Sequence, residues 1–133
     1  MKFSGRALVV EDNPVNQIVL KAQLQILGFE VDLADNGKVA LEKIEPDLYA
    51  IIFMDIQMPV MDGIECTENI RASEVECIRR IPIIAVTANV TKQYRDSCNT
   101  CGMNGFVTKP LDVPKLIEEI KSCLISKECA SGE

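Results

Sequence analysis

The fold of this chain is decided by the stretch Ile51-Ile52-Phe53-Met54-Asp55-Ile56-Gln57-Met58-Pro59-Val60-Met61-Asp62-Gly63. It opens with an unbroken apolar run rich in β-branched and aromatic side chains, which is typical of a strand buried on both faces. Pro59 and Gly63 then mark the turn that ends it. Asp55 is therefore predicted to lie at the carboxyl end of a central strand, where open α/β sheets place their chemistry.

Apolar runs or alternation predict five strands, at residues 6–10, 29–34, 49–54, 81–86 and 106–107. Apolar side chains at helical spacing, with caps such as Asn13 and stops such as Gly28, predict helices at residues 14–26, 37–45, 64–72, 91–101 and 113–124. Residues 73–80 are expected to form a charged connection. The repeated alternation of strand and helix predicts an α/β protein with a doubly wound parallel sheet.

The composition predicts one globular domain over residues 1–133, with a core of about 6–125 and a polar tail at 126–133. No apolar run approaches the ~20 residues of a membrane helix, and residues 1–6 lack the apolar segment of a signal peptide. We therefore expect a cytoplasmic domain, although a longer parent chain would be free to carry a membrane anchor. The net charge of -6 argues against direct nucleic-acid binding, which requires a basic surface.

Six cysteines are present, and Cys98 and Cys101 form a CxxC pair. A zinc site would need further ligands, but the chain has no histidine and no second CxxC. The helical spacing of this pair favours a packing role, while a redox or metal role stays open. The absence of histidine also means that no histidine base and no phosphohistidine can come from this chain.

Five polar residues follow the predicted strands: Glu11 and Asp12 the first, Asp55 the third, Thr87 the fourth and Lys109 the fifth. Each alone has an ordinary explanation, such as a helix cap or a solvated loop charge. Because parallel strands end at the same edge of a sheet, however, all five should meet there.

Three crowded carboxylates repel one another unless a proton or a cation intervenes. Oxygen ligands in an open site suit Mg²⁺, which waits for phosphate oxygens to complete its shell. Lys109 would add a second positive charge, and Thr87 would supply a hydroxyl donor. Such a site is suited to placing a phosphoryl group on Asp55, because phosphoryl transfer depends mainly on positioning and charge neutralisation.

The sequence resembles the receiver domain of two-component response regulators, especially the receivers attached to hybrid sensor histidine kinases. The resemblance is carried by Leu8-Val9-Val10-Glu11-Asp12-Asn13-Pro14-Val15-Asn16-Gln17, Met54-Asp55-Ile56-Gln57-Met58-Pro59-Val60-Met61-Asp62-Gly63, Thr87-Ala88-Asn89 and Lys109-Pro110. With the strand-helix pattern, these segments cover about residues 6–125. The resemblance implies a flavodoxin-like (βα)5 fold with the strand order 2-1-3-4-5.

The resemblance also implies a phosphoacceptor. Asp55 would take a phosphoryl group from a phosphohistidine on a histidine kinase or a histidine phosphotransfer protein. Glu11, Asp12 and Asp55 would hold Mg²⁺ together with the main-chain carbonyl of Gln57. The domain would itself catalyse its phosphorylation and dephosphorylation, and the parent chain is expected to be a hybrid histidine kinase.

Lys109 would then pair with Asp55 and afterwards with the phosphoryl group, while Thr87 would move toward that group. Phe106 occupies the switch position, where the family often has tyrosine, so a hydroxyl-mediated step is in doubt. The readout face would comprise the helix at 91–101, the strand at Phe106 and the last helix, and phosphorylation-dependent homodimers are possible. The bond before Pro110 matches one that is usually cis in the family.

Gln57 and Asn89 stand two residues after Asp55 and Thr87, where the family tunes dephosphorylation, although ordinary polar loop roles are equally compatible. A free-standing response regulator is the main alternative to a hybrid-kinase domain. An aspartyl-phosphate phosphohydrolase would want a second aspartate at position 57. A flavodoxin-like cofactor binder would want a phosphate loop after the first strand, where Glu11 and its acidic neighbour stand instead. A degenerate scaffold receiver would have lost an acidic or lysine position.

Overall fold

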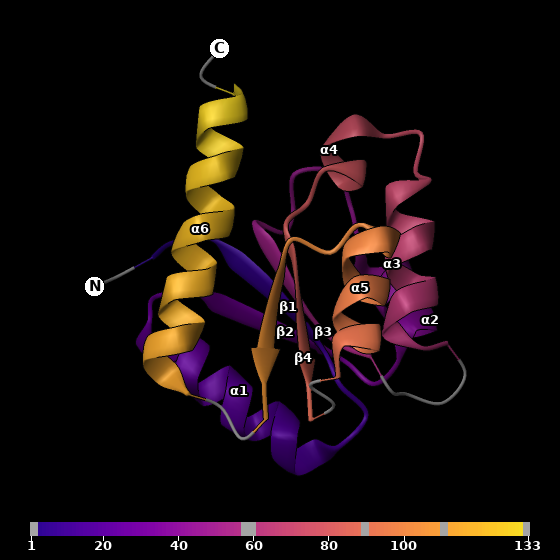
Figure 1. Ribbon diagram of the computed structural model, residues 1–133. Helices are drawn as coiled ribbons and strands as arrows, with labels where there is room; N and C mark the ends of the chain where they lie inside the picture. The colour runs from indigo at the N-terminus through magenta and orange to yellow at the C-terminus, as the bar shows by residue number, and fades with distance from the viewer. Residues whose placement is uncertain (1–2, 57–60, 89–90, 110–111, 132–133) are drawn as a thin grey trace.

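The computed structural model describes residues 3–56, 61–88, 91–109 and 112–131. Its strands form one parallel sheet in the order β2-β1-β3-β4-β5 (Figure 1). The strands are β1 (Arg6–Val10), β2 (Glu30–Ala34), β3 (Ile51–Asp55), β4 (Ile83–Thr87) and β5 (Gly105–Thr108). The helices are α1 (Pro14–Ile26), α2 (Gly37–Lys43), α3 (Gly63–Arg71), α4 (Glu76–Arg79), α5 (Lys92–Cys101) and α6 (Val113–Ser131). The predicted fold class and strand order are confirmed.

The central strand, β3, is buried along its whole length. Met54 pairs with Val10 of β1 on one side and with Ala85 of β4 on the other. Asp55 closes the strand opposite Val86. The apolar run was therefore correctly interpreted as a strand covered on both faces, and it delivers a single carboxylate to the carboxyl edge of the sheet.

Helices cover both faces of the sheet, with α1 and α6 on one face and α2, α3 and α5 on the other (Figure 1). The first face is packed by Leu20, Leu24, Phe53, Leu116 and Ile120. The second is packed by Met54, Cys66, Ile70, Ile83 and Cys98. Each large apolar side chain buried in this way stabilises the fold by roughly 1.5–3 kcal/mol. The two layers fix the strands, and hence the positions of the polar residues at their ends.

The connection predicted at residues 73–80 contains a short helix, α4. Its conformation is stabilised by a side chain of the preceding helix, because the Arg71 guanidinium donates to the carbonyls of Arg79 and Ile81 at 2.7 and 2.8 Å. The same guanidinium donates to the carbonyl of Gly102 at 2.9 Å and to Oδ1 of Asn104 at 2.7 Å. Local periodicity carries no sign of these tertiary contacts, which is why the sequence predicted an irregular segment.

The last helix, α6, continues to Ser131, beyond Leu124 where the predicted apolar spacing ends. No glycine or proline follows Pro114 before Gly132, so no residue of that kind stops the helix earlier. In the described part of the chain, neither α6 nor any other helix is long and apolar enough to cross a membrane.

Candidate functional site

The turn after β1 is shaped by Asn13, which sets the start of α1. Its side chain accepts hydrogen bonds from the main-chain nitrogens of Val15 and Asn16 at 2.9 and 3.2 Å, as a helix N-cap does. The main-chain nitrogen of Glu11 donates to the Ala34 carbonyl of β2 at 3.0 Å. The acidic pair before Asn13 is thereby held at the carboxyl edge of the sheet.

Three carboxylates meet at this edge. Glu11, Asp12 and Asp55 each offer one oxygen, and these oxygens lie within 4.8 Å of one another. Asp12 is exposed, whereas Glu11 and Asp55 are only 4% and 6% exposed. Such crowding calls for a compensating positive charge, and an all-oxygen donor set suits a hard divalent cation. The residues present therefore fit a magnesium ion.

Lys109 reaches the same cluster from the end of β5. Its Nζ lies 3.1 and 3.3 Å from the two carboxylate oxygens of Glu11 and 3.5 Å from Oδ2 of Asp55. The main-chain nitrogen of Lys109 donates to the Thr87 carbonyl at 2.9 Å, which fixes the base of the lysine. The ammonium thus bridges the two buried acids, and it lies closer to Glu11 than to Asp55.

Three influences compete at Glu11. Burial alone would raise the pKa of this carboxyl, but hydrogen bonds with Asp55 and Asn16 and the positive charge of Lys109 outweigh burial and lower the pKa. Glu11 is therefore ionised at neutral pH, as a cation ligand must be.

Thr87 lies at the carboxyl end of β4, whereas Phe106 lies two residues before the end of β5, opposite Ala85. Thr87 closes β4 and is 1% exposed. Phe106 is half-buried, and the guanidinium of Arg95 lies 5.1 Å from the centre of its ring, within the range of a cation–π contact. The main-chain nitrogen of Phe106 donates to Oε1 of Glu119 at 3.2 Å. The Arg95 contact could not be expected from the sequence, because it joins α5 to β5.

Three residues singled out from the sequence, Gln57, Asn89 and Pro110, lie outside the described residues. Their expected roles at the metal, along the water path and in the turn after Lys109 stay predictions.

Two further residues, which the sequence did not predict individually, contact the site. Asn16 Nδ2 donates to Glu11 Oε1 at 2.8 Å, and Gln17 Nε2 donates to the Glu11 main-chain carbonyl at 2.6 Å. Both residues belong to the Asn13–Gln17 segment, which was noted only as a family resemblance. Their position in the first turn of a helix directly after an acidic pair was the available signal.

The CxxC cysteines lie inside the second packing layer. Cys98 and Cys101 are both buried free thiols, and Cys101 Sγ donates to the Cys98 carbonyl at 3.3 Å. Burial raises the pKa of Cys98 to about 11 and also raises that of Cys101. Neither thiol belongs to the acidic group found among the described residues, so the geometry agrees with the packing role.

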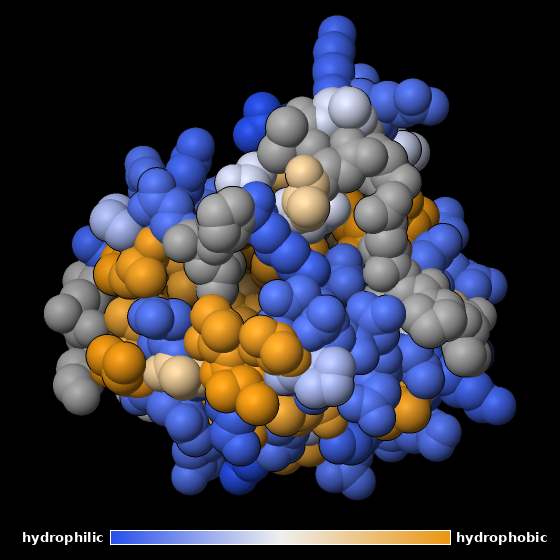
Figure 2. Space-filling view, turned by 90° about the horizontal axis from the view of Figure 1, so that it is seen from below, coloured by the Kyte–Doolittle hydropathy of each residue, from blue (hydrophilic) through white to orange (hydrophobic). Residues whose placement is uncertain are grey.

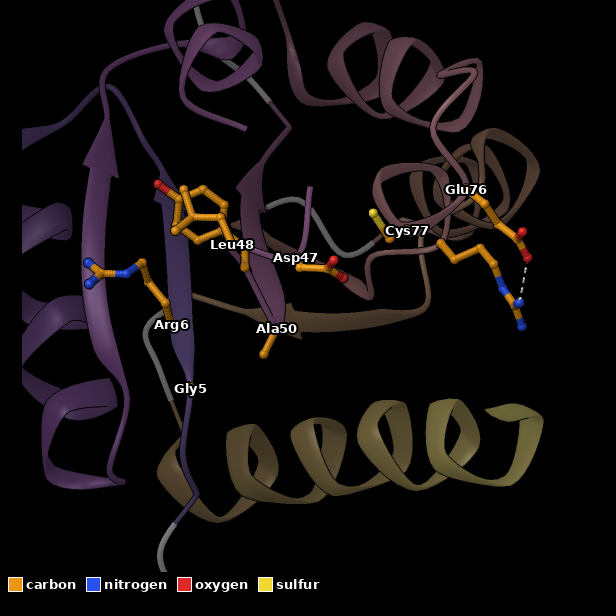
Figure 3. Close-up of a pocket in the computed structure, with 9 residues that line it drawn as sticks. Gly5, Arg6, Asp47, Leu48, Ala50, Glu76 and Cys77 are labelled. Carbon is orange, nitrogen blue, oxygen red and sulfur yellow. Dashed lines mark hydrogen bonds and ion pairs between the residues drawn. The ribbon is translucent and has the colours of Figure 1, made fainter. Parts of the chain in front are cut away.

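A separate cavity of about 530 Å³ lies at the opposite edge of the sheet, between residues 5–6, 47–50 and 76–80. Figure 3 shows Arg6 on one side of it and Glu76 on the other. Arg6 is paired with Glu30 and Asp32, both at 3.1 Å, and Glu76 with Arg80 at 3.0 Å. Both arginines already have carboxylate partners, so this cavity offers no comparable concentration of unmatched charge.

The face seen in Figure 2 is the side on which the strands end and along which α1 runs. Hydrophobic side chains gather there beside a hydrophilic area. Helix α1 contributes four exposed apolar residues to the surface of the molecule, namely Val15, Ile18, Val19 and Ile26. Because Val15 adjoins Asn16, which contacts Glu11, this apolar surface borders the acidic cluster.

A family model described as the response regulator receiver domain matches residues 7–121. "Hybrid signal transduction histidine kinase L" of Dictyostelium discoideum is 43% identical over 124 residues, which cover 90% of this chain. "Hybrid signal transduction histidine kinase M" of the same organism is 40% identical over 124 residues, covering 91% of this chain. The chain spans only 7% and 5% of the lengths of these two relatives.

Among solved structures, the receiver domain of the sensor histidine kinase PA1611 from Pseudomonas aeruginosa is 40% identical, with a TM-score of 0.79. The match covers 90% of this chain and 98% of that one. That structure is described as having a magnesium ion coordinated in its active site cleft.

Proposed function

Because the chain belongs to the response regulator receiver family, we propose that it is the phosphoacceptor domain of a two-component phosphorelay and that Asp55 receives the phosphoryl group. One observation supports this most strongly: Asp55 ends the buried central strand within reach of two further carboxylates and the Lys109 ammonium. The domain would occupy residues 1–133 as a single unit. The two Dictyostelium relatives favour a hybrid histidine kinase as the parent chain over a free-standing regulator.

In the proposed reaction, an oxygen of Asp55 forms a bond to the phosphorus of a partner's phosphohistidine. The phosphorus–nitrogen bond breaks, and the imidazole nitrogen keeps the electron pair. Lys109 neutralises negative charge beside Asp55, and the Thr87 hydroxyl donates a hydrogen bond to the incoming group. The added ~1.5 to 2 negative charges would then bias the loops that carry Lys109 and Thr87.

Mg²⁺ would be held by Glu11, Asp12 and Asp55 with the main-chain carbonyl of Gln57, and when bound it would neutralise charge on the phosphoryl oxygens. The oxygen-only donor set of the acidic cluster supports this assignment. The magnesium found in the Pseudomonas receiver supports it as well.

The partner would be a histidine kinase or a histidine phosphotransfer protein. Its docking surface would include the exposed apolar residues of α1, because this helix begins next to the acidic cluster, where Asn16 contacts Glu11. Ile18→Glu should therefore slow transfer from a phosphorylated partner while leaving phosphorylation by acetyl phosphate unchanged. Val75→Glu, an exposed apolar position in the connection between α3 and α4, is the matched control.

Incubation with Mg²⁺ and acetyl phosphate or a phosphorylated partner tests the central proposal. Intact mass should rise by one phosphoryl group in the wild type and in Asp47→Asn, an exposed acid at the opposite edge of the sheet. Asp55→Asn should not be modified. The phosphoacceptor assignment fails if the wild type accepts a phosphoryl group from neither donor.

A further inference from the structure

Two neighbouring amides on α1 reach back to one acidic residue. Asn16 donates to the Glu11 side chain, at Oε1, over 2.8 Å. Gln17 donates to the main-chain carbonyl of Glu11 over 2.6 Å and to Oδ1 of Asp35 over 2.8 Å. Side chain and main chain of the same residue are thus each held by a separate donor.

Burial limits the hydrogen-bond partners that are available to these two amides. Gln17 is 8% exposed, so its amide has little access to water and makes its hydrogen bonds to Glu11 and Asp35 instead. Asn16 is half-buried beside a carboxylate that is 4% exposed. An amide can donate to Glu11 without neutralising it, so the carboxylate stays available to a cation.

Lys109 gives Asn16 a specific task. Its ammonium contacts both oxygens of Glu11, at 3.1 and 3.3 Å, and therefore attracts the carboxylate toward β5. Asn16, on α1, donates a hydrogen bond to one of these two oxygens, Oε1. The position of the Glu11 carboxylate is therefore set by both the Lys109 ammonium and the Asn16 amide.

We propose that Asn16 and Gln17 are positioning residues that prearrange Glu11 for divalent-cation binding, Asn16 through the carboxylate and Gln17 through the main chain. The inference rests on the proposed function of the site, since it assigns Glu11 to the cation. Neither amide is itself a ligand. Outer donors of this kind orient metal ligands, and losing one typically weakens metal affinity about 10–100-fold.

The test measures binding of Mn²⁺, used as a spectroscopic probe of the magnesium site, by electron paramagnetic resonance. Asn16→Ala should weaken Mn²⁺ binding on the order of tenfold. It should raise the Mg²⁺ concentration needed for half-maximal phosphorylation by acetyl phosphate, while the rate at saturating Mg²⁺ stays close to that of the wild type. Asn69→Ala is the matched control, because Asn69 also donates from a helix, to the Glu65 carbonyl at 2.9 Å, but away from the site.

Asn16→Ala loses the hydrogen bond to Glu11, but alanine is a better helix former than asparagine, so the metal-free thermal midpoint should fall by only a few degrees. Asn16→Gln keeps the amide donor and should restore part of the affinity. If Asn16→Ala does unfold, the comparison moves to Asn16→Gln and Asn16→Ser, of which the serine variant should bind the probe more weakly.

A double-mutant cycle with Glu11→Gln separates positioning from general damage. Asn16→Ala should have little further effect on Mn²⁺ affinity once Glu11 is replaced. Unchanged affinity in Asn16→Ala, or an equal loss in both backgrounds, would overturn the inference. If the wild type binds Mn²⁺ with this dependence yet accepts no phosphoryl group, the proposed function fails and the positioning role stands.

Discussion

Replacing Lys109 by methionine is expected to reveal how much the acidic cluster depends on this one cation. Methionine keeps most of the length and apolar contact of the lysine stem but removes its charge. In the absence of divalent metal, the variant leaves Glu11 and Asp55, at 4% and 6% exposure, without the ammonium that lies 3.1 and 3.5 Å from their oxygens. Removing one partner of a buried ion pair typically costs about 3–5 kcal/mol.

Protonation of one of the two buried acids limits how much stability Lys109→Met can lose. A carboxyl group with the usual pKa of 4.5 takes up a proton at pH 7 at a cost of about 3.4 kcal/mol, from ~1.36 kcal/mol for each pH unit. The variant would therefore protonate one acid before losing more than about 3 kcal/mol at pH 7, and less than about 1 kcal/mol at pH 5.

The stability of the wild type depends on pH in the opposite direction from that of the variant: the wild type loses the contribution of Glu11 as the pH falls, whereas the variant is penalised more as the pH rises. Because the pKa of Glu11 is lowered on folding, its stabilising contribution is present above the usual pKa and is lost only as the pH falls through the lower folded value. The stability difference between wild type and variant should consequently grow as the pH rises from about 5 to 7.

Urea unfolding followed by circular dichroism in EDTA, at both pH values, measures this difference. Lys121→Met, at an exposed position on α6, is the control. Added Mg²⁺ should stabilise Lys109→Met more than the wild type, because the ion supplies the missing positive charge. Equal stability at pH 7, or a loss that does not change with pH, would refute the reasoning.

Four other substitutions or conditions should have distinct effects. A Cβ at Gly63 would lie 2.2 Å from the Asp55 carbonyl oxygen, so Gly63→Ala should destabilise the fold by about 1–3 kcal/mol and slow acetyl-phosphate labelling, as measured by urea unfolding and mass spectrometry. Arg71→Met removes four hydrogen bonds and should cost about 2 kcal/mol in urea unfolding without changing labelling at saturating Mg²⁺; unchanged stability would contradict this. Burial raises the pKa of Cys98 from 9.0 to about 11. The contribution of the buried neutral thiol to stability should therefore be complete below pH 9 and decrease toward pH 11, as measured by thermal unfolding. Peptide mapping after iodoacetamide treatment at about pH 8 should find half-buried Cys77 modified before Cys98.

Most of the architecture was predictable because it follows from local pattern. The all-apolar run before Asp55 allows only a strand covered on both faces, and helical spacing after each strand places the covering layers. Parallel strands then bring Glu11, Thr87 and Lys109 to the same edge without further information. Helix α4 was missed because its conformation depends on Arg71, which belongs to the preceding helix.

The sequence by itself determined which elements form, their order and which polar residues gather beside Asp55, since periodicity and strand direction are properties of the chain. Only the tertiary structure decided that Lys109 lies nearer Glu11 than Asp55, that Asn16 and Gln17 hold Glu11, and that Arg95 covers Phe106. The physical reason is that a long polar side chain has several allowed rotamers. Its partner is chosen by the burial and charge of neighbours that come from other elements.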